Sequence, residues 1–257
     1  MIIFKSPEEI DRMRTAGRIV ALTIDALLAA VRPGRTTQVL DVLAEEFIRN
    51  KGAVPSFKGY RGFPGTICTS LNQEVVHGIP SPKRKLAPGD VLKLDVGAVW
   101  EGYHADSAVS AFVGGAPSEE AEKLVRVTEE SLEAGIAALR LGARLSDVGH
   151  AVQQVAEGAG FSCVREYAGH GVGRALHEDP QVPNYGDPGR GPVVKPGLVV
   201  AIEPMVNVGT WRTKVLGDRW TVVTADGRLS VHFEHTMAVT EDGTEVLTAR
   251  PETSPPP

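Results

Sequence analysis

Four acidic residues interrupt apolar runs that are typical of buried β-strands, and they constrain this chain more than any other feature. They are Asp95, Asp106, Glu203 and Glu234. Asp95, for example, lies in the sequence Val-Leu-Lys-Leu-Asp-Val, and Glu203 directly follows Val-Val-Ala-Ile. A buried carboxylate is stable only beside a compensating partner or a metal ion. The fold therefore has to place a compensating partner or a metal ion beside each of these four carboxylates.

Two of the four carboxylates are predicted to meet in a β-hairpin. The turn signal Glu101-Gly102 separates two strand-like segments, 91–99 and 103–113. Pairing across this turn places Asp95 and Asp106 opposite each other to within a residue or two, in reach of one cation. The alternative for either residue alone is a strand-end aspartate that accepts hydrogen bonds from turn amides.

A histidine between two glycines is the fifth unusual feature. His170 lies in the sequence Gly-His-Gly-Val-Gly, and His177 follows seven positions later. The glycines let the backbone approach a ligand closely and exclude an ordinary helix. Two incidental polar histidines in a Gly-rich turn are the alternative. Together with the four carboxylates, His170 indicates an oxygen-rich metal site, which suits Mn, Fe or Co at least as well as Zn. Two adjacent ions would spread the negative charge better than one.

The remaining pattern predicts helices followed by strands, twice over. Ser6 is expected to cap a helix that ends near Val31, and Ser118 and Ser146 are expected to cap two later helices. The predicted helices are 7–31, 37–51, 119–141 and 147–158, and the further strands are 66–71, 161–165, 198–208, 220–223 and 234–240. The order suggests an internal duplication. The fold class is α+β, with mainly antiparallel strands and helices grouped on one side.

Composition excludes several classes of protein. The 257 residues carry a net charge of −5, which argues against nucleic-acid binding by bulk charge. The longest near-apolar stretch, 19–31, contains Asp25 and is shorter than the roughly 20 residues of a membrane span. No signal peptide is visible, and Cys68 and Cys163 fit a reducing cytoplasm. We expect one catalytic domain over 1–250 and a mobile Pro-rich tail over 251–257.

Five motifs in order resemble the type I methionine aminopeptidases, within the "pita-bread" metallohydrolases. These motifs are His77-Gly78-Ile79-Pro80, Asp95 with Asp106, the segment 170–180, Glu203-Pro204, and Phe233-Glu234-His235-Thr236. The resemblance implies the pita-bread fold, a pseudo-twofold pair of helix-helix-strand halves with a curved sheet and helices on its outer face. It also implies two divalent metal ions (Co, Mn, Fe, Zn or Ni), bound by Asp95, Asp106, His170, Glu203 and Glu234, with Asp106 and Glu234 bridging.

The same resemblance implies the remaining site residues. His77 and His177 would lie beside the substrate, and Glu203 would accept and return a proton. The side chains of Tyr60, Phe63, Cys68, Leu176 and Trp220 would line a pocket for methionine. Without the resemblance, Tyr60 and Phe63 could be loop anchors and Cys68 a small buried hydrophobe. Leu176 is a departure, because many relatives have an aromatic residue there.

The predicted function is removal of the initiator methionine from nascent cytoplasmic proteins whose second residue is small, by dinuclear-metal-assisted hydrolysis. The expected partners are nascent N-termini with transient ribosome contact, and the chain is expected to be monomeric, without nucleic-acid specificity or membrane contact. Two alternatives remain: an Xaa-Pro peptidase of the same fold, and a non-catalytic binding module. We expect neither the N-terminal domain of prolidases, nor the zinc-binding extension of some type I enzymes, nor the insertion of type II enzymes.

Overall fold

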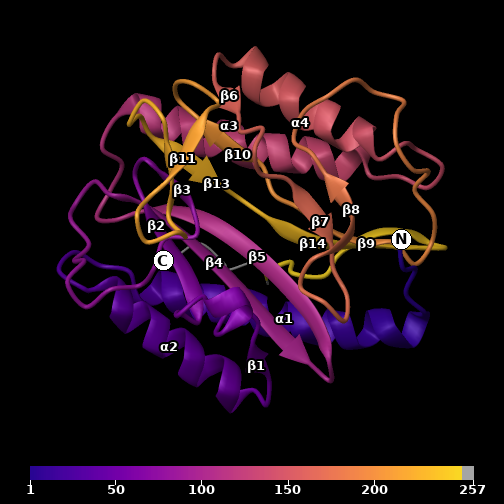
Figure 1. Cartoon of the computed structure of the whole chain (residues 1–257), viewed down its shortest axis with the longest axis horizontal. Helices are drawn as coiled ribbons and strands as arrows, with labels where there is room; N and C mark the ends of the chain where they lie inside the picture. The colour runs from indigo at the N-terminus through magenta and orange to yellow at the C-terminus, as the bar shows by residue number, and fades with distance from the viewer. Residues whose placement is uncertain (251–257) are drawn as a thin grey trace, which may run out of the picture.

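The helices lie on the outside of the molecule, with one pair on each side of the strands (Figure 1). The computed structural model describes residues 1–250, so the predicted tail, 251–257, lies outside the described residues. Helices α1 (Pro7–Ala30) and α2 (Thr37–Asn50) come from the first half of the chain, and α3 (Glu119–Ala138) and α4 (Ser146–Gly158) from the second. All strand pairings in the described residues are antiparallel. The α+β prediction is confirmed, whereas the helices form two separate pairs rather than the single group that was predicted.

Local sequence signals predict the N-terminal caps of α1 and α3 correctly, but not the cap of α4. Helix α1 has the predicted capping box: the Ser6 hydroxyl accepts the Glu9 N–H, and the Glu9 carboxylate accepts the Ser6 N–H at 2.9 Å. Ser118 caps α3 as predicted. The predicted cap of α4 is wrong, because Leu145 is the N-cap and Ser146 is the first helical residue. The Ser146 hydroxyl instead accepts the distant Arg190 N–H at 2.7 Å.

The predicted hairpin is confirmed as β4 (Val91–Trp100) and β5 (Tyr103–Phe112). Asp95 pairs with Ala108 and Asp106 pairs with Gly97, an offset of two residues. The other edge of β4 pairs with β1 (Val54–Pro55) and β2 (Ile67–Leu71). Helix α1 packs across both long strands. The two aspartates therefore lie on a hairpin that is held by neighbouring strands at one edge and by helix α1 across its face.

The predicted strand 198–208 is divided, whereas the predicted strand 234–240 is confirmed as β14 (His235–Thr240). The first divides into β9 (Val199–Ile202) and β10 (Met205–Asn207), and an unpredicted strand, β13 (Ser230–His232), precedes β14. Strand β9 pairs with β14, whereas β10 pairs with β13 in a different sheet. Pro204 has no N–H with which to continue a ladder. Glu203 and Glu234 thus lie at the two breaks rather than within strands.

Several short strands escaped the sequence analysis, because two to five residues show no readable periodicity. They are β1, β13, β3 (Glu74–Val76), β7 (Gly169–Gly171), β8 (Glu178–Val182), β11 (Thr213–Val215) and β15 (Gly243–Val246). The predicted strands near 161–165 and 220–223 are the shorter β6 (Ser162–Cys163) and β12 (Val222–Thr224). The strands of residues 1–250 form four hydrogen-bonded sheets.

One hydrophobic core joins the two halves. Its fully buried members include Leu27 of α1, Leu94 of β4, Leu124 of α3 and Ile202 of β9. That 1–250 form a single domain stays a prediction. Within the described part of the chain, no helix combines the length and the apolar character that crossing a membrane requires.

We predict that Gly17→Ala destabilises the protein, although alanine is the better helix former by about 1 kcal/mol. A Cβ at Gly17 would lie 2.3 Å from the carbonyl oxygen of Leu247. Overpacking of this kind costs about 1–3 kcal/mol. The matched control is Gly158→Ala in α4, where nothing lies within 4 Å, so that its stability should stay the same or rise. Denaturant unfolding of both variants measures the effect, and equal stabilities would contradict it.

Candidate active site

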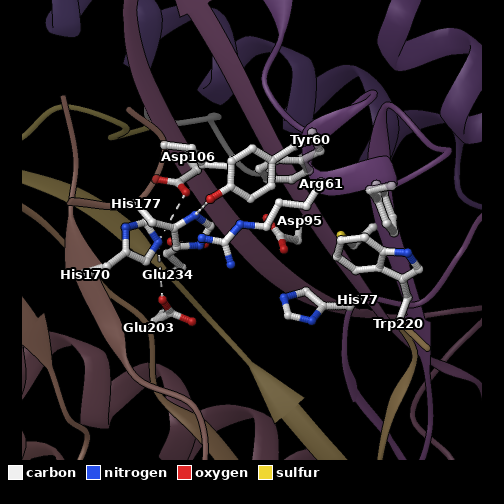
Figure 2. Close-up of a pocket in the computed structure, with 14 residues that line it drawn as sticks. Tyr60, Arg61, His77, Asp95, Asp106, His170, His177, Glu203, Trp220 and Glu234 are labelled. Carbon is white, nitrogen blue, oxygen red and sulfur yellow. Dashed lines mark hydrogen bonds and ion pairs between the residues drawn. The ribbon is translucent and has the colours of Figure 1, made fainter. Parts of the chain in front are cut away.

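Every site residue predicted from the sequence lines one cavity of about 170 Å³ (Figure 2). Its lining residues are Phe57, Tyr60, Arg61, Phe63, Cys68, His77, Asp95, Asp106, His170, Leu176, His177, Glu203, Trp220 and Glu234. Figure 2 shows His170 and several of the acidic residues at one end, and His77 and Trp220 at the other. The cavity thus has a charged end and an apolar end, which includes the aromatic side chain of Trp220.

The charged end is a compact cluster of potential metal ligands. Asp106 of β5, His170 of β7 and Glu234 each offer a donor atom, and the three atoms lie within 4.8 Å of one another. The Nε2 atom of His170 is 3.7 Å from Asp106 Oδ2 and 3.6 Å from Glu203 Oε1 (Figure 2). Asp95 completes the acidic lining from β4.

Backbone contacts between the halves position these carboxylates. The Glu234 N–H donates to the Ala108 carbonyl at 2.9 Å, which ties the break between β13 and β14 to strand β5. The Thr236 hydroxyl accepts the Asp106 N–H at 3.0 Å and donates to the Asp106 carbonyl at 2.7 Å. The Asn184 side-chain amide donates to the Glu203 carbonyl at 2.9 Å. The main chains of Asp106, Glu203 and Glu234 are therefore fixed, and the carboxylate of Asp106 also accepts a hydrogen bond from the Thr236 hydroxyl at 3.2 Å.

Burial together with mutual repulsion shifts the pKa values of the carboxylates upward. Burial raises the pKa of Asp106 to about 6. Burial, reinforced by neighbouring carboxylates, also raises the pKa values of Asp95, Glu203 and Glu234. Within residues 1–250, the only basic side chains at ion-pair distance from the four acids are His170 and His232, and burial lowers the pKa of each imidazole. No lysine or arginine among the described residues lies at that distance to compensate the buried negative charge.

These donor groups fit a divalent metal ion. The Oδ1 atom of Asp95 is buried and has no hydrogen-bond partner. An unpartnered buried carboxylate oxygen is costly, and a cation that it ligates removes this cost. Carboxylate oxygens with one imidazole are ligands for the harder and borderline divalent metals. The site therefore indicates divalent metal binding by this cluster.

Two further histidines flank the cluster. His177 forms a hydrogen bond between Nδ1 and the Tyr60 hydroxyl at 2.9 Å, and its ring centroid lies 4.1 Å from that of His170. Burial lowers the pKa of His177 to about 4, and the neighbouring His170 adds to the effect. Burial also lowers the pKa of His77 to about 4. Both imidazoles are neutral at pH 7, so each has one N–H donor and one acceptor nitrogen.

The apolar end of the cavity is one packed cluster. It consists of Phe57, Phe63, Cys68 and Leu176, with Tyr60, Ile79 and Trp220 packed against it. Phe63 and Trp220 meet edge to face with centroids 5.1 Å apart. Cys68 lies opposite Asp95 in the ladder between β2 and β4, which joins the apolar end to the charged end. All five residues predicted for the methionine pocket meet here, while their role stays a prediction.

Three residues near the cavity were missed by the sequence analysis: Phe57 and Arg61 line the cavity, and Tyr167 packs edge to face on His77. A fourth residue, His232, has no role assigned from the sequence, and its Nε2 atom is 3.8 Å from Glu203 Oε2. Phe57 follows only from tertiary structure: a Cβ at Gly97 would meet its ring at 2.6 Å.

Comparison with known proteins shows the family. The sequence profile of metallopeptidase family M24 matches residues 11–241, and the chain belongs to this family. Within it, the chain is similar to methionine aminopeptidases. It is 55% identical to methionine aminopeptidase 1 of Bacillus subtilis, across 96% of this chain and 99% of the relative. The corresponding enzyme of Mycobacterium tuberculosis is 50% identical, across 95% of this chain and 94% of the relative.

Solved structures confirm the pita-bread fold. The methionine aminopeptidase of Thermotoga maritima superimposes with a TM-score of 0.95 at 46% identity, across 97% of this chain and 100% of that one. A prolidase from Pyrococcus furiosus superimposes with a TM-score of 0.78 at 22% identity, across 97% of this chain and 66% of the prolidase. At that identity the prolidase is evidence for a shared fold alone.

We predict that the apparent affinity for a divalent metal rises as the pH rises from 5 to 7. Raised carboxyl pKa values, about 6 for Asp106, mean that protons compete with the metal below pH 6 and leave when it binds. Calorimetric titration with Mn²⁺ in two buffers of different ionisation enthalpy measures both affinity and proton release. The control, Asp106→Asn, should bind more weakly and release fewer protons. Equal affinity at both pH values would contradict the role of these carboxylates.

Proposed function

We propose that this protein removes the N-terminal methionine from polypeptides whose second residue is small, by metal-assisted hydrolysis of the first peptide bond. The observation that carries the proposal is that the acidic cluster and an apolar pocket line opposite ends of one small cavity. Similarity to methionine aminopeptidases over 96% of the chain supports it. The combination suits a substrate with an apolar side chain and a free amine beside the first peptide bond.

The acidic cluster is the proposed site of two divalent ions. Asp95, Asp106, His170, Glu203 and Glu234 would hold them, and Asp106 and Glu234 are the proposed bridges. When bound, such ions activate water for attack on a carbonyl and polarise that carbonyl. The number of ions and their identity (Co, Mn, Fe, Zn or Ni) are parts of the proposal that metal analysis tests.

His177 is the proposed donor to the oxygen of the scissile carbonyl. Its imidazole is neutral at pH 7, because its pKa lies near 4. When the Tyr60 hydroxyl donates to Nδ1, the proton of the ring resides on Nε2, which is then available as a donor. A fixed donor aimed at a developing oxyanion stabilises the transition state more than the ground state.

Glu203 is the proposed proton acceptor, and His77 is the proposed hydrogen-bond donor to the rest of the substrate. Burial and neighbouring carboxylates raise the pKa of Glu203, which makes its carboxyl a better proton acceptor than an exposed one. His77 lies beside Trp220, with ring centroids 6.2 Å apart, and would donate to the peptide beyond the scissile bond. His77 has a positive φ of 61°, an uncommon backbone conformation for a non-glycine residue. Such outliers occur often at functional sites.

The apolar end of the cavity is the proposed methionine pocket. An unbranched thioether packs well against aromatic and aliphatic walls such as Phe63, Leu176 and Trp220. The aliphatic Leu176 is 2% exposed and is already packed within this wall. Nascent polypeptides as substrates, contact with the ribosome, a monomeric state and a cytoplasmic location belong to the proposal as well, and rest on the sequence.

A peptide panel tests the proposed specificity. The metal-loaded protein should cleave Met-Ala-Ser and should cleave Met-Ile-Ser about 10–200-fold less well or worse, because a rigid site discriminates against added methylenes by this factor or more. Ala-Pro peptides should not be cleaved. Chromatographic assay of free methionine gives kcat/KM for each peptide. Preferential cleavage of Ala-Pro would instead favour an Xaa-Pro peptidase, and no cleavage of any peptide would favour a binding module.

We predict that His177→Ala lowers kcat by on the order of 10²-fold or more, because one donor to the oxyanion is lost. Bound metal, measured by elemental analysis after gel filtration, should match that of the wild type. The control is His150→Ala, because His150 bonds the Gly186 carbonyl away from the cavity, and its kcat should be unchanged. Loss of metal from His177→Ala would make His177 a ligand instead.

A further inference from the structure

The segment before α1 is attached to the loop that carries His177. Lys5 is only 6% exposed, although lysine is rarely buried. Its backbone N–H donates to the Gly197 carbonyl at 2.7 Å. Its ammonium group donates to the Ile3 carbonyl at 2.9 Å and to Glu178 Oε2 at 2.6 Å. A buried ion pair thus connects the N-terminal segment to Glu178, which directly follows the loop between β7 and β8.

Glu178 directly follows His177 in the sequence and organises the loop from inside. Its second oxygen, Oε1, accepts the Ala175 N–H at 3.1 Å. The Ala175 carbonyl in turn accepts the Gly173 N–H at 3.1 Å. One carboxylate therefore joins the ammonium group of Lys5 to the backbone two residues before His177. Both oxygens of Glu178 are used, and its side chain is 8% exposed.

The packing around this ion pair leaves little freedom. A Cβ at Gly173 would lie 2.5 Å from Glu178 Oε1 and 2.6 Å from Lys5 Cε. The Gly173 carbonyl also accepts the His104 N–H at 2.8 Å, which ties the loop to strand β5. Removing one member would leave the other charge buried without its partner, a strongly unfavourable arrangement. The loop would then shift to solvate the remaining charge.

We propose that the Lys5–Glu178 ion pair is a positioning device for His177, so that the N-terminal segment is part of the catalytic apparatus. The proposal rests on the function proposed above. Tyr60 fixes the imidazole from one side through the bond to Nδ1, and the ion pair fixes the backbone at the next residue. Neither Lys5 nor Glu178 lines the cavity, so both act through His177. Displacement of a catalytic group by about 1 Å can lower the rate by about 10²-fold.

The competing interpretation is that the pair merely attaches the N-terminal segment to the fold. A more exposed ion pair serves as a comparison, because Arg14 of α1 also binds the second half of the chain. Its guanidinium group binds the carboxylate of Glu245 on β15, with Nε 2.7 Å from Oε1, and the two side chains are 45% and 38% exposed. Arg14 and Glu245 do not line the active-site cavity. If attachment to the second half of the chain is all that an ion pair provides, neither Lys5→Met nor Arg14→Met should lower kcat in the folded, metal-loaded protein.

The experiment compares Lys5→Met, Lys5→Arg, Glu178→Gln and Arg14→Met as metal-saturated, full-length proteins acting on Met-Ala-Ser. We expect kcat to fall about 10–100-fold in Lys5→Met and Glu178→Gln, with KM and bound metal close to wild type. Lys5→Arg should restore most of kcat, and Arg14→Met should leave it unchanged. Where Lys5→Met does not fold, the double variant Lys5→Met/Glu178→Leu removes both charges, and its kcat should still be low.

A double-mutant cycle with His177→Ala distinguishes positioning of His177 from simple attachment of the N-terminal segment. If the pair acts through His177, Lys5→Met should lower kcat by less than about twofold in the His177→Ala background. An equal loss in both backgrounds, a loss of bound metal, or a similar kcat defect in Arg14→Met would overturn the proposal. A Lys5→Met variant as active as the wild type would do the same. A wild type that cleaves no methionine peptide would instead reject the proposed function, and this proposal with it.

Discussion

Confinement of four carboxylates in one buried space is the constraint on which the rest of this structure depends. Burial raises the pKa values of Asp95, Asp106, Glu203 and Glu234, and Asp106 raises those of the other three further. Among residues 1–250, histidines are the only basic side chains at ion-pair distance from these acids. Without a cation, such an arrangement would cost several kcal/mol per charge. Divalent metal binding offsets that cost, and the same ions supply the chemistry of the site. The same cluster of carboxylates therefore destabilises the protein without metal and binds the ions that its chemistry requires.

The two halves of the chain meet where this cluster forms. The Glu234 N–H pairs with the Ala108 carbonyl on β5, and the breaks at Glu203 and Glu234 lie side by side. Each break lets the chain pass from one sheet to another and frees a glutamate from the alternation of strand side chains. The first half supplies the hairpin aspartates, and the second supplies both glutamates and His170. Neither half holds all five of the proposed metal ligands.

Around the cluster, the protein fixes the neighbouring side chains from several directions. Tyr60 bonds His177, Thr236 bonds the backbone of Asp106, and Asn184 bonds the backbone of Glu203. Such contacts hold catalytic groups in place before substrate arrives, which is how electrostatic stabilisation becomes effective. The Lys5–Glu178 pair extends this support to the beginning of the chain. A small cavity with firmly held walls would also account for the proposed selectivity by size.

The sequence by itself determined the site residues better than the strands that carry them. Misplaced carboxylates are a strong signal, because burial penalises charge wherever the chain runs, and the capping box of α1 is equally local. The hairpin register followed from one turn. Tertiary structure alone decided the rest: the division at Pro204, the short strands, the contact of Ser146 with Arg190, and the packing of Phe57 against Gly97. Apart from the division at Pro204, each of these depends on a partner more than 35 residues away or on a ladder of two to five residues, and neither leaves a periodic pattern in the sequence.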